Sequence, residues 1–475
     1  MTPEARAFAG DGIRPRPRLR ARQEEPKGAA EQDSPVDSSA PPEAAVGDDA
    51  ARTEDVAAAG AAAPGPPGSA PDSSAAPGEE PAHIESRPPH VVIVGGGGTG
   101  GALAHDLALR GLRVTLVERG DVTSGSTGRH QGLLHSGARY ARTDPPTAGD
   151  CVAENRILRR IAAGSFEEND GLFVALTDEE AESETAFFEA CWQAAVPARR
   201  LTRAQALSLE PGLHPGLRLA VQVSDATMDA MRLPLRFFAT ARSNGAEIRT
   251  FTEVTGLLRS GACVEGVAIR DHVAGQDLEI RADLVVNAAG AWAGLVAAMA
   301  DVTLPMTLEA AVLVAVRGRH CNMVLNRLGD AGPGDLLVPQ RNQTVLAGSF
   351  VSVDDPQPAA ATDGATAMVE RAAEVLPAIG GAAIRASWSS VRPVFHDRVR
   401  PRRGATPVGR ETLCVDHAAG ARPVDGLVTI AGGNASSLRL MAERAGDLVC
   451  RKLGVDRACQ TSEQPLLPDS AWYAR

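Results

Sequence analysis

The stretch HVVIVGGGGTGGALAHDLALRGLRVTLVER, residues 90–119, decides the fold of this chain. Its residues 91–94 form a short apolar run that ends at glycine, which predicts a buried strand. Gly95, Gly97 and Gly100 follow at GxGxxG spacing. Glycine at these positions allows a tight turn, close approach of the backbone to a pyrophosphate, and close packing of a helix on a strand. The stretch therefore predicts a dinucleotide-binding β-α-β unit.

The residues after the turn extend this pattern. Residues 99–110 suit a helix whose first N–H groups would point at a phosphate. A second strand is expected over residues 114–117, and it runs into Glu118, roughly 20 residues past the glycines, where a group that binds ribose hydroxyls is expected. A glycine-rich turn without a ligand is the alternative. The carboxylate favours adenosine with a free 2′-hydroxyl, and hence FAD or NAD over NADP.

Composition separates the start of the chain from the rest. Residues 1–87 are rich in Ala, Pro, Gly, Ser, Asp and Glu and hold few large apolar residues, so we expect a disordered low-complexity tail. The remainder is long enough for a two-domain core and has no apolar run of bilayer length. The formal net charge of −11 disfavours nucleic acid as a partner. These features predict a cytoplasmic protein that is at most attached to the inner face of the cell membrane.

Cysteine and lysine usage restricts the chemistry. The seven cysteines are scattered without a CxxC pair, which argues against an iron–sulfur or zinc site and fits a reduced cytoplasm. Lysine occurs only as Lys27 and Lys452. A mechanism that needs a lysine in the active site is therefore almost excluded.

The segment SGSTGRHQGLLHSGARY, residues 124–140, is dense in small residues and carries two histidines and two arginines. Such a segment is either a loose loop or a backbone held close to a bulky ligand, and its place directly after the nucleotide motif favours the second interpretation. Its part LLHSGARY, residues 133–140, resembles the flavin-binding run of FAD-dependent glycerol-3-phosphate dehydrogenases. The resemblance is strongest to the catalytic A subunit of the anaerobic enzyme, a D-amino-acid-oxidase-like flavoprotein.

Further motifs follow in the order of that family, and the resemblance extends from about residue 91 to about residue 453. The run SDATMDAMR, residues 224–232, is similar to the family's Asp-Gly-Thr-Val-Asp-Pro-x-Arg turn. The run VNAAGAWA, residues 286–293, implies a second backbone contact with FAD, with an ordinary strand-to-helix turn as the alternative. A last helix, expected over residues 435–452, would present its N-terminus to the flavin pyrimidine.

Arg392 is the one charged residue in an expected strand, SWSSVRPVF, residues 387–395. A charge placed there needs a partner, which is either a structural carboxylate or a substrate anion. The family carries a substrate-binding arginine in a similar Gly-Val-Arg-Pro motif. The resemblance therefore favours the substrate.

The sequence departs from the family pattern in three places. Gly432-Gly433-Asn434 stands where the family has Gly-Gly-Lys, so a charge beside the flavin is lost. Ser437-Leu438-Arg439 replaces Thr-Tyr-Arg, which keeps a hydroxyl and loses a phenol. The family's anaerobic enzyme also continues into a cysteine-rich C-terminal domain, and this chain shows no cysteine cluster.

The predicted fold class is α/β, with a Rossmann-like FAD-binding domain and a discontinuous, mainly antiparallel substrate domain. The FAD-binding domain is expected over residues 88–165, 221–300 and 425–458. The substrate domain is expected over residues 166–220 and 301–424, and a C-terminal tail over 459–475.

The resemblance assigns residues to the site. Residues implied to hold FAD are Gly95, Gly97, Gly100, Glu118, Arg119, Ser126, Thr127, Gly132, Leu133, Val254, Ala289, Gly290, Gly433, Asn434, Ala435 and Ser436. Residues implied to bind the substrate are Arg139, Tyr140, Arg392 and Asn434.

If the family chemistry holds, sn-glycerol 3-phosphate is oxidised to dihydroxyacetone phosphate by hydride transfer to flavin N5. Arg139 and Arg392 would clamp the phosphate, because a guanidinium fork matches phosphate oxygens. His135 is the candidate base, since it titrates near neutral pH. A histidine that orients against the flavin or is satisfied in the core is the alternative, and Arg392 is a second catalytic candidate that would stabilise the alkoxide.

Other readings stay open. Electrons would leave to a quinone or to a partner protein, which the sequence does not distinguish. A different small hydroxy or amino acid is an alternative substrate. A flavin-bound subunit with weak catalysis of its own is an alternative function.

Overall fold

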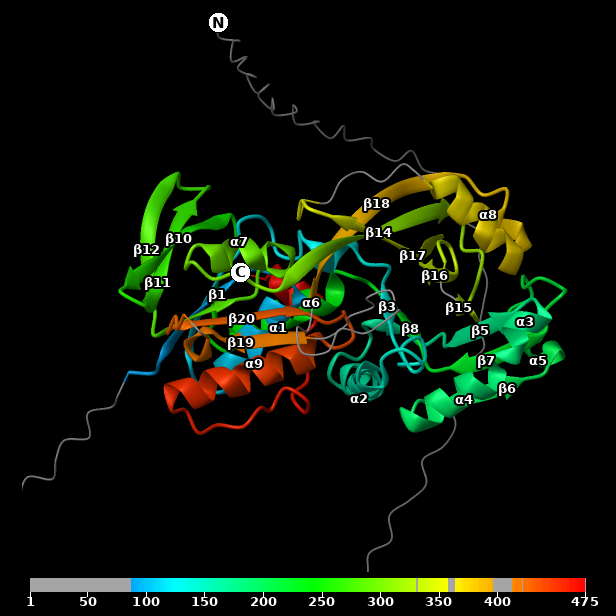
Figure 1. Ribbon diagram of the computed structural model, residues 1–475, viewed down its shortest axis with the longest axis horizontal. Helices are drawn as coiled ribbons and strands as arrows, with labels where there is room; N and C mark the ends of the chain where they lie inside the picture. The colour runs from blue at the N-terminus through cyan, green and yellow to red at the C-terminus, as the bar shows by residue number, and fades with distance from the viewer. Residues whose placement is uncertain (1–86, 330–331, 358–363, 396–411, 421, 475) are drawn as a thin grey trace, which may run out of the picture. The chain divides into compact units, whose positions relative to one another are not determined.

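A parallel sheet is built around the opening motif in the structure, which is a computed structural model (Figure 1). The structure describes residues 87–329, 332–357, 364–395, 412–420 and 422–474. All of these belong to one compact unit. The predicted tail, residues 1–87, lies outside the described residues except for Arg87.

The parallel sheet places β1 between two parallel neighbours, β2 and β13. Its strand order is β19 (Thr412–Asp416), β20 (Leu427–Gly432), β13 (Leu284–Asn287), β1 (His90–Val94), β2 (Arg113–Val117) and β9 (Glu247–Arg249). All five residues of β1 are buried, as expected for a strand covered on both faces. β19 runs antiparallel to β20 although it lies in the range predicted for the substrate domain. The predicted domain boundaries themselves stay a prediction.

The glycine turn joins β1 to α1 (Gly98–Leu109). Gly95 has φ = 114°, a conformation that glycine adopts readily, and its N–H donates to the carbonyl of Val117 at 2.9 Å. A Cβ atom added at Gly100 would lie 2.0 Å from the carbonyl oxygen of Gly95. Only a residue without a side chain therefore lets α1 pack this closely on the end of β1.

A second, larger sheet carries most of the remaining strands. Its order is β18 (Ile384–Phe395), β14 (Met306–Arg317), β17 (Gln343–Val353), β16 (Leu336–Gln340), β15 (Val324–Arg327), β5 (Gly171–Ala175), β7 (Leu219–Val223) and β6 (Ala198–Leu201). Every described pair in it is antiparallel except β15 with β5. The sheet agrees with the predicted mainly antiparallel fold.

Two small sheets complete the strands. One consists of β10 (Thr252–Ser260), β11 (Cys263–Asp271) and β12 (Gln276–Arg281). The other consists of β3 (Leu133–Leu134), β8 (Ala226–Met228) and β4 (Phe166–Glu167). β12 was not predicted, because its residues are nearly all exposed and show no apolar alternation.

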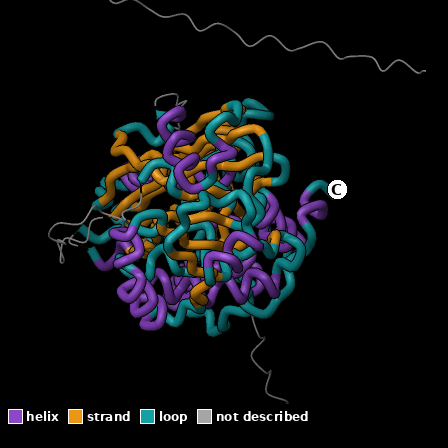
Figure 2. Tube along the Cα trace, turned by 90° about the vertical axis from the view of Figure 1, so that its right-hand side faces the viewer, coloured by secondary structure: helices purple, strands orange, loops and turns teal. Residues whose placement is uncertain are grey.

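The strands lie in the interior of the described part of the molecule, and the helices lie around them (Figure 2). Besides α1 they are α2 (Pro145–Ile161), α3 (Asp178–Glu182), α4 (Glu184–Gln193), α5 (Arg203–Leu209), α6 (Arg232–Ser243), α7 (Ala293–Ala298), α8 (Ala365–Val375) and α9 (Leu438–Leu453). The prediction that the last helix begins at residue 435 was wrong. Residues 434–437 form a turn in which the Ser437 N–H donates to the Asn434 carbonyl at 3.1 Å, so α9 begins at Leu438.

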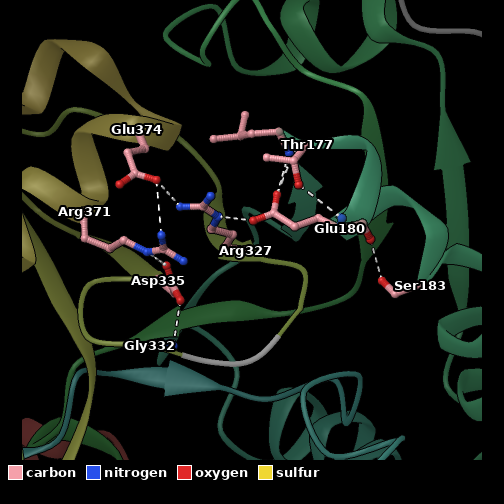
Figure 3. A network of polar contacts seen from close by, with 9 residues as sticks. Thr177, Glu180, Ser183, Arg327, Gly332, Asp335, Arg371 and Glu374 are labelled. Carbon is pink, nitrogen blue, oxygen red and sulfur yellow. Dashed lines mark hydrogen bonds and ion pairs between the residues drawn. The ribbon is translucent and has the colours of Figure 1, made fainter.

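An ion-pair network joins the helices α3 and α8 to β15, a strand of the larger sheet (Figure 3). Arg327 lies at its centre, 2.6 Å from Glu180 and in contact with Glu374. Glu374 also pairs with Arg371, which contacts Asp335 at 2.8 Å. The network fixes helices at two places along the chain to one strand of the sheet.

No helix in the described part of the chain is long and apolar enough to cross a membrane.

We predict that Gly100→Ala destabilises the protein, because the new Cβ would clash with the carbonyl oxygen of Gly95. Overpacking of this kind costs about 1–3 kcal/mol of unfolding free energy. Gly149→Ala in α2 is the matched control, since a Cβ there would meet no atom within 4 Å. Alanine should stabilise that helix by about 0.5–1 kcal/mol. Chemical denaturation measures both, and equal stability of the two variants would contradict the packing argument.

Candidate active site

Two adjoining cavities lie where the glycine turn, the 124–140 segment and the end of β13 meet. Their volumes are about 450 Å³ and about 210 Å³, which together fall within the range of small-molecule pockets. They share the lining residues Gly98, Thr99, Ser126, Thr127, Ala288 and Gly290. A long ligand can therefore extend from one cavity into the other.

The larger cavity is formed at the carboxyl ends of the parallel strands. Predicted FAD residues that line it are Gly95, Gly97, Glu118, Arg119, Ser126, Thr127, Val254, Ala289 and Gly290. The start of α1 also lies on its wall, so the positive end of the helix dipole is where the pyrophosphate is predicted. A Cβ added at Gly290 would meet no protein atom within 4 Å, which leaves room for a ligand against the backbone. These residues suit a dinucleotide such as FAD.

Glu118 is fixed by the glycine loop. Its Oε2 accepts from the Gly96 N–H at 2.7 Å and its Oε1 from the Gly120 N–H at 2.9 Å. A carboxylate oxygen can accept more than one hydrogen bond. Glu118 therefore retains acceptor capacity for ribose hydroxyls while its two backbone bonds hold its direction.

Two side-chain contacts order the rim of this cavity. The Arg119 guanidinium lies over the Trp292 ring, 4.3 Å from its centre. The Thr127 hydroxyl oxygen accepts from the Gly98 N–H at 3.0 Å, which ties the 124–140 segment to the first turn of α1. Trp292, in the VNAAGAWA run that is predicted to contact FAD, thus also stacks on Arg119. The sequence did not indicate this contact.

The smaller cavity holds the charged and titratable groups predicted to act on the substrate. His135, Arg139, Arg392 and Asn434 all line it, as do the predicted FAD residues Leu133, Gly433 and Ala435. These residues come from the 124–140 segment, from β18 and from the turn before α9. The structure thus brings together residues that are far apart in the sequence, from Leu133 to Ala435.

Tyr140 does not line either cavity formed by the described residues, and its assignment as a substrate-binding residue stays a prediction. Its side chain is 1% exposed and packs in an apolar cluster. The phenol oxygen lies 3.2 Å from Nε2 of His135, and the two rings are tilted at 54°. Tyr140 is therefore buried behind His135, and its phenol contacts the histidine ring rather than the cavity.

Three other predicted cofactor residues also lie behind the cavity walls. Gly100 packs on Gly95, as described above. Gly132 has φ = 77°, and its carbonyl accepts from the side-chain amide of Gln340 at 3.1 Å. The Ser436 hydroxyl oxygen accepts from the His135 N–H at 2.9 Å. These residues shape the wall that other residues present to the cavity.

Arg392 has the structural carboxylate that was one of its two expected partners. Its Nε and Nη2 contact Oε2 of Glu309 at 3.2 and 2.7 Å, and its guanidinium lies 4.3 Å from the centre of the Phe350 ring. Glu309 faces Arg392 because β14 and β18 pair in that register. Arg392 also lines the cavity, so its pairing with Glu309 leaves a role at a substrate anion open.

Asn434 uses its side chain within the turn before α9. Its Oδ1 accepts from the Ser436 N–H at 2.8 Å, and its Nδ2 donates to Sγ of Cys151 at 3.7 Å. In the part of the chain that the structure describes, Lys452 is the one lysine, and it pairs with Asp416 and Asp425 away from the cavity. No described ammonium therefore replaces the family's lysine at this site.

Phe350 and Ser390 line the smaller cavity although the sequence did not indicate them, and His130 and Gln131, which were predicted only as part of the 124–140 segment, line it too. Burial lowers the pKa of His130 to about 4, and its Nδ1 accepts from the Gly132 N–H at 2.9 Å. His130 is therefore neutral near pH 7. Its place in the 124–140 segment was the one available signal.

Residues 90–441 match the FAD dependent oxidoreductase family. The chain belongs to this family. The A1 subunit of the anaerobic glycerol-3-phosphate dehydrogenase of Haloferax volcanii is 38% identical over 379 residues, which cover 78% of this chain and 64% of that protein. The A subunit of the anaerobic enzyme of Escherichia coli is 39% identical over 373 residues, which cover 78% of this chain and 68% of that protein. The resemblance inferred from the motifs is confirmed.

The solved glycerol-3-phosphate dehydrogenase of Bacillus halodurans, complexed with FAD, has the same fold. Its TM-score is 0.60 at 22% identity, over 80% of this chain and 68% of that one. The predicted fold class is confirmed, and the predicted cofactor, FAD, is that of the family. This chain spans about two thirds of the length of the curated relatives it matches, 64% for the Haloferax protein.

We predict that Glu118→Ala weakens FAD binding about tenfold or more, since hydrogen bonds to charged groups contribute about 1.5–3 kcal/mol. The variant would also leave two backbone N–H groups without their acceptor. Glu253→Ala is the matched control, because Glu253 lines the same cavity but pairs with His272. The ratio of flavin absorbance to protein measures both, and full FAD content in Glu118→Ala would remove Glu118 from the cofactor site.

Proposed function

We propose that this flavoprotein oxidises sn-glycerol 3-phosphate to dihydroxyacetone phosphate. The observation that carries the proposal is the meeting of Arg139, Arg392 and His135 in the cavity that continues the predicted FAD cavity. The names of the relatives, A subunits of glycerol-3-phosphate dehydrogenases, support the same substrate.

Arg139 and Arg392 are the proposed phosphate ligands. Their guanidinium groups offer paired N–H donors that match phosphate oxygens. Part of the charge of Arg392 is offset by Glu309, 2.7 Å away. Arg139 donates to a neutral group, the Asn326 amide oxygen, at 3.0 Å. That contact directs the Arg139 guanidinium and does not oppose its charge.

His135 is the proposed base for the C2 hydroxyl proton. Its ring nitrogen Nε2 contacts the Tyr140 phenol, while its backbone N–H and carbonyl bond Ser436 and Asn155. These contacts hold the ring at the cavity wall. FAD, when bound, supplies the acceptor for the C2 hydride, so the loss of one proton and one hydride balances the oxidation to the ketone.

The route of the electrons after oxidation is also part of the proposal. Since the relatives are named as A subunits, we infer that this chain works with partner subunits that pass electrons to a quinone. Such partners would place it at the inner face of the cell membrane. The substrate would then be a phosphorylated polyol drawn from the cytoplasm.

Anaerobic addition of sn-glycerol 3-phosphate to the purified holoprotein tests the function. We expect loss of the oxidised flavin absorption bands and formation of dihydroxyacetone phosphate. A panel of small hydroxy acids and amino acids serves as the comparison, because Asn434 in place of lysine leaves fewer charges for a phosphate dianion. Reduction by a member of that panel, without reduction by sn-glycerol 3-phosphate, would replace the substrate. A flavin that nothing reduces would indicate a subunit with weak catalysis.

We predict that Arg392→Ala raises KM for sn-glycerol 3-phosphate about 10- to 100-fold, as expected for a lost charge-assisted hydrogen bond. FAD content should stay near that of the wild type. Arg385→Ala is the matched control, since Arg385 is an exposed residue of the same strand, β18, that lines neither cavity. Steady-state kinetics with an artificial electron acceptor measure KM and kcat. Unchanged kinetics in Arg392→Ala would take Arg392 out of the substrate site.

A further inference from the structure

A buried polar pair lies behind Arg139. Asn326, in β15, is 1% exposed, and Asp225, just before β8, is 3% exposed. Neither residue lines the cavities formed by the described residues. The pair therefore can act on the site only through the groups that it contacts.

Asn326 contacts both a cation and an anion. Its Oδ1 accepts from Nη1 of Arg139 at 3.0 Å, and its Nδ2 donates to Oδ2 of Asp225 at 3.5 Å. The reverse orientation would set an NH2 group against the guanidinium and a carbonyl against the carboxylate. The amide orientation is thus fixed by the charges on its two sides.

Asp225 anchors this pair to the backbone of the site. Its Oδ1 accepts from the Ser136 N–H at 2.7 Å, directly after His135. Burial raises the pKa of the Asp225 carboxyl, while the Ser136 hydrogen bonds and the charges of Arg139 and Arg159 lower it. A Cβ added at Gly171 would lie 2.7 Å from its Oδ2, so the carboxyl is tightly enclosed. Asp225 has little freedom to move, and neither has the amide that it holds.

We propose that Asn326 and Asp225 are positioning residues that direct Arg139 toward the substrate anion through a neutral amide contact. This inference rests on the proposed function, in which Arg139 binds the phosphate. A long, flexible side chain loses conformational entropy when it binds, and a fixed partner reduces that loss. The amide gives direction, whereas the carboxylate holds the amide. The arrangement contrasts with the contact between Arg392 and Glu309, in which a carboxylate meets the guanidinium directly.

Asn326→Ala is the first test, made in the FAD-loaded protein. We expect KM for sn-glycerol 3-phosphate to rise about tenfold, kcat to change less than threefold, and FAD content to stay constant. The dissociation constant of inorganic phosphate, measured by calorimetry on the oxidised protein, should rise by the same factor as KM. Asn322→Ala is the matched control, because Asn322 lies four residues earlier and contacts Glu210 instead.

The double variant Asp225→Asn with Asn326→Asp tests whether Arg139 needs a neutral partner or only a partner that fixes its direction. It keeps one amide and one carboxyl in contact but places the carboxylate against Arg139. We expect the thermal midpoint to stay near that of the wild type and phosphate binding to weaken more than in Asn326→Ala. Phosphate binding and KM that match the wild type in both variants would overturn the proposal.

The outcomes also separate this inference from the proposed function. If sn-glycerol 3-phosphate does not reduce the wild type but phosphate binding still depends on Asn326, the substrate is wrong and the positioning role stands. If the wild type is reduced and Asn326→Ala behaves like Asn322→Ala, the function stands and the positioning role is wrong. A wild type that sn-glycerol 3-phosphate does not reduce and that binds no phosphate would overturn both.

Discussion

Hydrogen bonds from other elements to the backbone of residues 126–140 hold the site together. This segment has little regular structure of its own, one short turn of helix and the two residues of β3. The side chains that bond its N–H and carbonyl groups belong to Asn155, Asp225, Gln340, Trp388, Ser390 and Ser436. They come from the larger sheet, from α2 and from the turns before β8 and α9. Because backbone groups must be paired when they leave water, these bonds fix the path of the segment where it has no sheet or helix partner.

The part of the site that local sequence encodes was predictable. The glycine turn, α1 and Glu118 lie within 30 residues, and each has a conformational or chemical reason that a single stretch displays. The residues lining the two cavities largely come from motifs that the family resemblance identifies. A motif does not say which of its residues line a cavity and which support the wall behind them. Four predicted site residues are of the second kind: Gly100, Gly132, Ser436 and Tyr140.

The partners of the site's cations were not predictable. Glu309 lies 83 residues from Arg392, and Asn326 lies 187 residues from Arg139. Their contacts depend on strand pairing, β14 with β18 and β15 with β5, and no local pattern specifies that register. The same limit applies to the Asn434 departure. The sequence shows a lost charge, but only the fold shows the amide committed to Ser436 and Cys151.

The order of the strands in the parallel sheet bears on how the protein is made. β1, β2, β9 and β13 lie before residue 288, whereas β20, which covers the free edge of β13, spans Leu427–Gly432. The turn at Gly433 and Asn434 and the first residue of α9 then close the smaller cavity. Every strand of the larger sheet lies between β2 and β20 in the sequence. The whole larger sheet is therefore synthesised before the residues that complete the smaller cavity. Until β20 pairs with it, β13 has an open edge, and unpaired strand edges make folding intermediates prone to aggregation.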